Sequence, residues 1–248
     1  MSEPQKSRPG VPPAAREIER RLNWGALPAI LFLVMLASLG AIAMYSTLAR
    51  PRTAHGLPAD PDIDAARALL EGRMRSPVHE LRFGSALCGE TMPDGEGAAG
   101  HDALAAARER LERALERHPL DPRALTALAH AELALRRNGD AESHYRLALE
   151  FTPHYGEARL GLGLALAQRA FRTGHPHERR RLQLRALAQF AAVREDDAVA
   201  ASALYNRAVM SWMTGRRDRA RRLAAEYLSA DPDSPWAARL AMTIGGNE

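Results

Sequence analysis

Residues 122–155 read PRALTALAHAELALRRNGDAESHYRLALEFTPHY. In this segment, small side chains recur where two packed helices would cross, and larger apolar side chains fill the space between them. The positions concerned are Leu125, Leu128, Ala129, Ala141, Tyr145 and Ala148, and Pro153 closes the unit. Alanine at a crossing lets two helix backbones approach to the roughly 8–10 Å of close packing. The segment therefore predicts a pair of antiparallel helices.

The same arrangement recurs on both sides of this segment. Residues 201–234 repeat it in register with Leu204, Ala208, Gly215, Ala220, Ala224, Tyr227 and Pro232, although Arg207 replaces one leucine. A third unit lies between, with Leu160, Leu162, Gly163 and Leu166, then an insertion around Thr173–Arg181, then Ala186, Phe190 and Val193. Upstream, Ala107, Leu111, Ala114 and Pro119 fit the second half of a further unit. A loop at Gly89–Gly100 stands where the first half should begin, so we expect that half to be missing or rebuilt.

This pattern resembles the tetratricopeptide repeat, a helical hairpin of 34 residues. The resemblance implies an all-α superhelix of about three repeats over residues 103–246, closed by a capping helix at Trp236–Met242. It also implies a concave groove, lined by the first helix of each hairpin, that holds a peptide or helix. The alternative fold is an alanine-rich helical bundle without superhelical stacking.

Matching positions between repeats predicts the side chains that line the groove. They are Arg123, Thr126, His130 and Leu133 from one repeat, Glu157, Leu160, Leu164 and Gln168 from the next, and Tyr205, Val209, Trp212 and Met213 from the last. Tyr205 and Trp212 are candidate anchors, because aromatic rings are frequent at binding hot spots. For Trp212, packing in the core is the alternative interpretation.

An apolar segment precedes the repeats. No charged residue occurs between Leu22 and Ala49, and Ala26–Met44 is long enough to span a bilayer. Trp24 and Tyr45 bracket it as membrane-interface anchors. We therefore expect a cytoplasmic basic tail over 1–22 and a single transmembrane helix over 23–47. The alternative is a signal peptide cleaved after Ala43.

Basic residues predict the orientation of this segment. Arg8, Arg16, Arg20 and Arg21 precede it, whereas only Arg50 and Arg52 follow closely. This bias favours a cytoplasmic N-terminus. Lys6 is the only lysine among 34 Lys and Arg residues, a skew typical of GC-rich bacterial genomes. The expected location is therefore a bacterial inner membrane, with the repeat domain in the periplasm.

The charge distribution argues against a nucleic-acid partner. Seven of the 34 basic and three of the 30 acidic residues lie in 1–52, so the rest of the chain is balanced. The linker over 48–102 contains a predicted helix at Asp62–Met74 and the Gly-rich loop. The arginines of residues 216–222 are expected to form a solvated helix face, with docking of an acidic partner as the alternative.

We find no motif for catalysis or for a cofactor. His175 and His177 flank Pro176 within the insertion, but no further ligand completes a metal site, so an exposed loop is expected. Cys88 is the sole cysteine and excludes an internal disulfide. These absences predict a protein that is not an enzyme and has no cofactor, metal or small-molecule substrate.

Together these features predict a membrane-anchored scaffold or assembly factor that binds a protein partner, in a membrane or periplasmic complex, through the groove. Two alternatives remain open. In one, the chain is an accessory subunit of a membrane complex, held mainly by its transmembrane helix. In the other, the repeats face the cytosol as a receptor.

Overall fold

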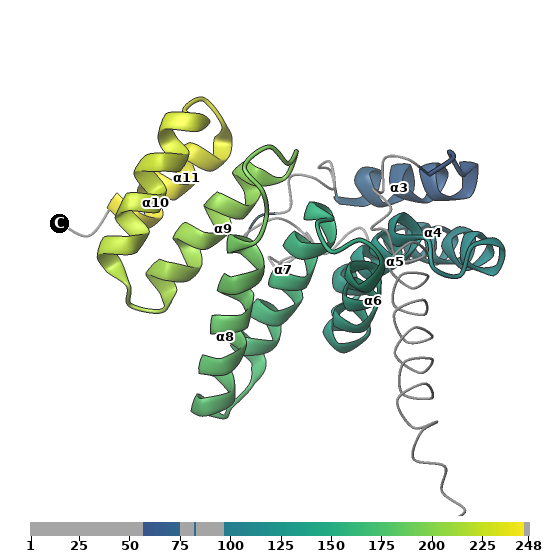
Figure 1. Cartoon of the computed structure of the whole chain (residues 1–248), viewed down its shortest axis with the longest axis horizontal. Coiled ribbons are helices and arrows are strands. Elements are labelled where there is room, and N and C mark those ends of the chain that lie inside the picture. Colours follow the sequence, from purple (N-terminus) through teal and green to yellow (C-terminus); the bar gives the residue numbers. More distant parts are fainter. Residues whose placement is uncertain (1–56, 75–81, 83–96, 246–248) are drawn as a thin grey trace, which may run out of the picture. The chain divides into compact units, whose positions relative to one another are not determined.

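The computed structural model describes residues 57–74, 82 and 97–245, and these residues form helices and connections without any strand (Figure 1). The helices are α3 (Pro61–Met74), α4 (Gly97–Arg117), α5 (Pro122–Ala134), α6 (Asn138–Phe151), α7 (Gly156–Arg172), α8 (Pro176–Ala191), α9 (Ala200–Met213), α10 (Arg217–Ala230) and α11 (Pro235–Gly245). No helix within these ranges is both long and apolar enough to cross a membrane. The predicted tail 1–22, the span 23–47 and its anchors Trp24 and Tyr45 lie outside the described residues.

The helices pack as consecutive hairpins. The pairs α3/α4, α5/α6, α7/α8 and α9/α10 make the most extensive contacts, each pair touches the next, and α11 closes the series against α9 and α10. The described part of the chain thus has four hairpins and a capping helix, rather than about three repeats. The sequence placed the helix near Asp62–Met74 in the linker, but α3 supplies the first helix of the first hairpin. Its Ile63, Ala66 and Leu70 are buried in one core with Leu111 of α4.

Local sequence explains where the helices begin and turn. Asp121 caps α5 by accepting a hydrogen bond of 2.8 Å from the Arg123 amide, and Pro122 occupies the first helical position, where no amide hydrogen is needed. The turns that follow α5 and α9 each contain a left-handed residue, at Arg136 (φ 59°) and Gly215 (φ 77°). Both fall at the same position of the repeat, but only glycine adopts this conformation without steric cost.

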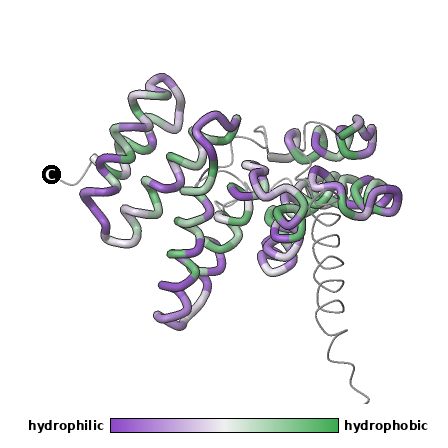
Figure 2. The backbone as a smooth tube through the Cα atoms, in the orientation of Figure 1, coloured by the Kyte–Doolittle hydropathy of each residue, from purple (hydrophilic) through white to green (hydrophobic). Residues whose placement is uncertain are grey.

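Small residues lie where the sequence placed helix crossings. A methyl group at Gly161 of α7 would overlap the ring of Tyr145 of α6, and one at Gly163 would overlap the ring of Phe190 of α8. Both rings are almost wholly buried. In Figure 2, hydrophobic and hydrophilic residues alternate along each helix, as expected for helices with one buried face. The close approach of α6, α7 and α8 therefore depends on these glycines.

The insertion mostly lengthens two helices instead of forming a loop. α7 continues to Arg172 and α8 begins at Pro176, so the connection consists of Thr173–His175 alone. His175 and His177 are both exposed, as expected, but His177 belongs to α8. The expectation of an exposed loop is correct for the exposure and wrong for the conformation of residues 176–181. Helical backbone satisfies its own hydrogen bonds, which is why extra residues extend a hairpin readily.

Candidate partner-binding site

The twelve predicted groove residues all lie on α5, α7 and α9, with Glu157 in the first turn of α7. These first helices adjoin one another, because α5 contacts α7 and α7 contacts α9. Eight of the twelve side chains are buried: Thr126, His130, Leu133, Leu160, Leu164, Gln168, Tyr205 and Val209. Arg123, Glu157 and Trp212 are partly buried, and only Met213 is exposed. Contact of these residues with a partner remains a prediction, but most of them do not offer free surface.

At the N-terminal end of the array, the chain's own helix α3 contacts the predicted groove residues. Arg67 of α3 donates two hydrogen bonds of 2.9 Å to the two carboxylate oxygens of Glu157 on α7. The Tyr155 hydroxyl donates a third, of 3.0 Å, to Glu157. Burial raises the pKa of the Glu157 carboxyl, but the hydrogen bonds and positive charge of Arg67 outweigh burial and hold that pKa below its usual value. Glu157 is therefore an ionised partner of Arg67.

His130 lies deep in this region and is uncharged at neutral pH. Its side chain is 1% exposed, its Nε2 atom has no hydrogen-bond partner, and its ring meets that of Tyr145 edge-on at 5.5 Å. Burial lowers the pKa of His130 to about 4. An imidazole this far from solvent cannot reach a partner without rearrangement of the helices that cover it.

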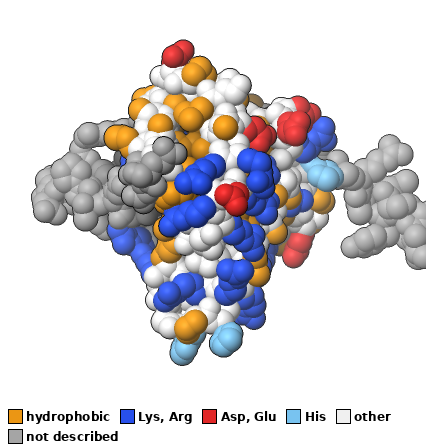
Figure 3. All heavy atoms as spheres, turned by 90° about the vertical axis from the view of Figure 1, so that its left-hand side faces the viewer, with side chains coloured by type: hydrophobic (Ala, Val, Ile, Leu, Met, Phe, Trp, Pro, Cys, Tyr) orange, Lys and Arg blue, Asp and Glu red, His pale blue; other side chains and the backbone are white. Residues whose placement is uncertain are grey.

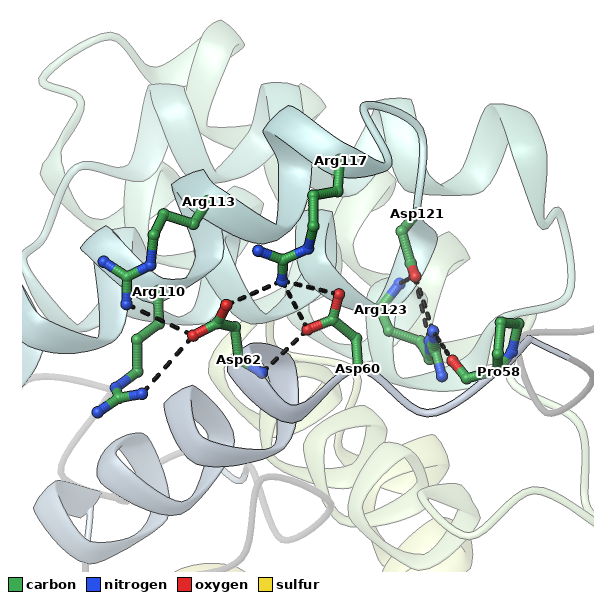
Figure 4. Close-up of polar contacts among 8 residues, drawn as sticks. All are labelled: Pro58, Asp60, Asp62, Arg110, Arg113, Arg117, Asp121 and Arg123. Atoms are coloured by element: carbon green, nitrogen blue, oxygen red, sulfur yellow. Dashed lines mark hydrogen bonds and ion pairs between the residues drawn. The ribbon is translucent and has the colours of Figure 1, made fainter.

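Arg123 binds the segment that precedes α3 (Figure 4). Its Nη2 atom donates to the backbone carbonyl of Pro58 at 2.7 Å and to the Asp121 carboxylate at 2.8 Å. Beside it, Arg117 of α4 donates to Asp60 at 3.0 Å and to Asp62 at 2.8 Å. Arginines of α4 and α5 therefore bind residues 58–62, at the start of α3 and just before it.

At the C-terminal end, an arginine from between α3 and α4 occupies an aromatic corner. The guanidinium of Arg82 lies 5.8 Å from the ring centroid of Tyr227 on α10 and 5.5 Å from that of Trp236 on α11. An Arg82 nitrogen stands 3.7 Å from the carboxylate of Asp231. The predicted anchor Tyr205 packs edge-on against both rings, with centroids 5.6 and 5.4 Å away. Its position is therefore in the core of the last repeat.

Trp212 and Met213 end α9, and Met213 is the one predicted groove residue that is exposed. Met213 is 51% exposed, and the guanidinium of Arg217 lies 3.6 Å from the ring centroid of Trp212. Arginine side chains gather on this end of the molecule in Figure 3, and those of α10 at 217, 219, 221 and 222 are exposed. The expected arginine face of α10 is thus solvated, except that Arg217 covers an indole ring.

The described residues do not form a metal-binding site. No group of three or more His, Cys, Asp or Glu side chains there is close enough to hold an ion. Glu132 and His144 form a pair at 2.8 Å, and the hydrogen bond to Glu132 raises the pKa of His144. Cys88 lies outside the described residues.

The sequence did not predict the contacts that Arg67, Arg82 and Trp236 make. Trp236 had a usable signal, because extending the repeat register by one unit places it in the capping helix at the position of Arg123. The two arginines had none, since their partners lie far away in the sequence and no local pattern marks such contacts.

Comparison with known proteins agrees with this architecture. Residues 95–155 and 184–235 match the family model of the tetratricopeptide repeat. The fold is similar to that of a thermophilic tetratricopeptide-repeat protein of Thermus thermophilus, with 23% identity over 60% of this chain and 78% of that one and a TM-score of 0.52. No curated protein sequence matches the chain. Residues 95–155 and 184–235 thus match tetratricopeptide repeats, and the described residues form an all-α array of the tetratricopeptide-repeat type, as the sequence pattern predicted.

Proposed function

We propose that this chain is a non-catalytic scaffold, anchored in a bacterial inner membrane, that uses its tetratricopeptide repeats to bind a protein partner in the periplasm. The carrying observation is the alignment of α5, α7 and α9, in which successive first helices contact one another along one array. Repeats stacked in this way present a continuous surface to another polypeptide.

The membrane part of the proposal rests on the uncharged segment over 23–47, its flanking rings Trp24 and Tyr45, and the excess of arginine before it. A reporter enzyme that is active only outside the cytoplasm, fused after Glu248, tests the orientation. We expect activity. An inactive but stably produced fusion would place the repeats in the cytosol and would favour the receptor alternative.

Partner capture tests the scaffold role. The full-length chain, crosslinked mildly in intact membranes and then solubilised, should recover one or a few proteins in constant ratio to itself. A matched sample with Met213→Asp should recover less of them, because Met213 is the exposed member of the predicted groove set. Recovery of no protein with either sample would refute the scaffold role.

Exchange of the predicted transmembrane helix distinguishes the scaffold role from the accessory-subunit alternative. If residues 23–47 are replaced by an unrelated transmembrane helix, a partner held by the repeats stays bound. A partner held by the membrane helix is lost. We expect the partner to be retained.

A further inference from the structure

The corner that holds Arg82 has the composition of an arginine-binding site. Two aromatic rings, Tyr227 and Trp236, stand within 6 Å of the guanidinium, and the carboxylate of Asp231 supplies the opposite charge. A planar guanidinium stacks on aromatic faces and pairs with carboxylates better than an ammonium group does. The Tyr227 hydroxyl donates to Asp231 at 2.7 Å and so keeps that carboxylate in place.

Arg82 fits this corner imperfectly. Its ion pair with Asp231, at 3.7 Å, is longer than a hydrogen bond, and its buried Nε atom has no hydrogen-bond partner. An unpaired buried donor is costly. Arg67 provides the contrast within the same chain, because it meets Glu157 through two bonds of 2.9 Å.

The corner is open to solvent on one side. The Asp231 side chain is 34% exposed, and Trp236 is only partly buried. The corner also lies on the last hairpin and the capping helix, whose apolar core contains Tyr205, Leu223 and Leu240, and Arg82 itself is buried against it with 5% of its surface exposed. A second arginine can therefore reach Asp231 from solvent, and it gains the position beside the two rings when Arg82 leaves it.

We propose that Tyr227, Asp231 and Trp236 form an arginine-binding subsite, that Arg82 occupies it in the free chain, and that a partner polypeptide replaces Arg82 with an arginine of its own. The proposal rests on the scaffold function, since it names what the partner must present. It identifies the partner segment by chemistry, as one that bears an exposed arginine, and not as an acidic or apolar peptide.

A peptide titration on the purified full-length chain in mild detergent tests the subsite without any partner. The probes are acetyl-Gly-Arg-Gly-amide and its counterparts with citrulline, which has the shape of arginine without the charge, or lysine. We expect Arg82→Ala to bind the arginine peptide at least tenfold more tightly than the unaltered chain does, with at least tenfold preference over the citrulline peptide. Asp231→Asn, added to Arg82→Ala, should abolish that preference.

Arg239→Ala is the matched control. Arg239 also lies near the Trp236 ring, at 5.8 Å, so its removal changes the charge around the indole and leaves Arg82 in place. Binding by this variant should equal that of the unaltered chain. Circular dichroism must show unchanged helix content. If Arg82→Ala fails that criterion, Arg82→Lys replaces it, with an expected increase in affinity of at least threefold.

Two results would overturn the proposal. One is a folded Arg82 variant that binds the arginine peptide no better than the unaltered chain. The other is equal binding of the arginine and citrulline peptides. Because the titration contains no partner, it can succeed when partner capture fails, and the two failures remain distinguishable.

Discussion

The ion pair between Arg67 and Glu157 should link α3 energetically to the rest of the array. We consider a double-mutant cycle made of Arg67→Met, which keeps the apolar stem, Glu157→Gln, and both together. Hydrogen bonds to charged groups contribute about 1.5–3 kcal/mol. The Arg67 and Glu157 side chains are 26% and 17% exposed, so solvent reduces the value, and we expect a coupling free energy of about 1.5 kcal/mol. Urea unfolding of the full-length chain in mild detergent, followed by circular dichroism, measures it.

The loop pair Arg194–Asp196 provides the control cycle. Its ion-pair distance is 2.8 Å, but its side chains are 61% and 69% exposed, so solvent screens the pair and its coupling free energy should be much smaller than that of Arg67 and Glu157. The pH dependence has a definite sign. Because the folded pKa of Glu157 lies below its usual 4.5, the coupling should be complete above pH 4.5 and should decrease as the pH falls through the folded value. A coupling at Arg67 no larger than that of the loop pair would refute the linking role of α3.

Three further outcomes can be measured in the same unfolding assay. Gly163→Ala should destabilise the chain by about 1–3 kcal/mol, because the added methyl group meets a buried ring. Gly72→Ala has open space around it and should stabilise the chain by about 0.5–1 kcal/mol. A gain in stability at both sites would contradict the packing argument. Because the folded pKa of His130 is depressed to about 4, the free energy of unfolding should decrease as the pH falls below 6.5. With both proteins set equal at pH 7.5, the chain should lose about 2 kcal/mol at pH 5 relative to a His130→Leu variant. Parallel pH profiles of the two proteins would contradict a neutral, buried imidazole. Arg136→Gly should stabilise the chain by about 0.5–1 kcal/mol and Gly215→Ala should destabilise it by about 1 kcal/mol, because both positions require a left-handed backbone. A lower unfolding midpoint for Arg136→Gly than for Gly215→Ala would show that the two turns differ.

The repeats could be predicted because their physical requirement is local. A small residue such as Gly163 must stand opposite a large one such as Phe190, and this requirement recurs at a fixed interval. The pairing of α3 with α4 escaped prediction because residues 75–96 separate the two helices, so the fixed interval is lost. Ala66 and Leu70 are nevertheless buried like residues of the other first helices. The contact of Arg67 with Glu157 could not be predicted, because transferring positions from one repeat to the next assumes that those side chains face open space.

The contrast between the two ends of the array bears on how a partner would bind. The segment upstream of α4 contacts the array at both ends, through Arg67 at one and Arg82 at the other. A partner side chain replaces a residue of the chain itself only where the partner's contacts with the site are better than those that are broken, because binding strength is a difference between the two. Arg67 uses both oxygens of a largely buried carboxylate and leaves little to gain, whereas Arg82 leaves a buried donor unpaired beside a partly exposed carboxylate. The proposed exchange at the last repeat should therefore cost less free energy than the displacement of α3, and we expect α3 to stay part of the array when a partner binds.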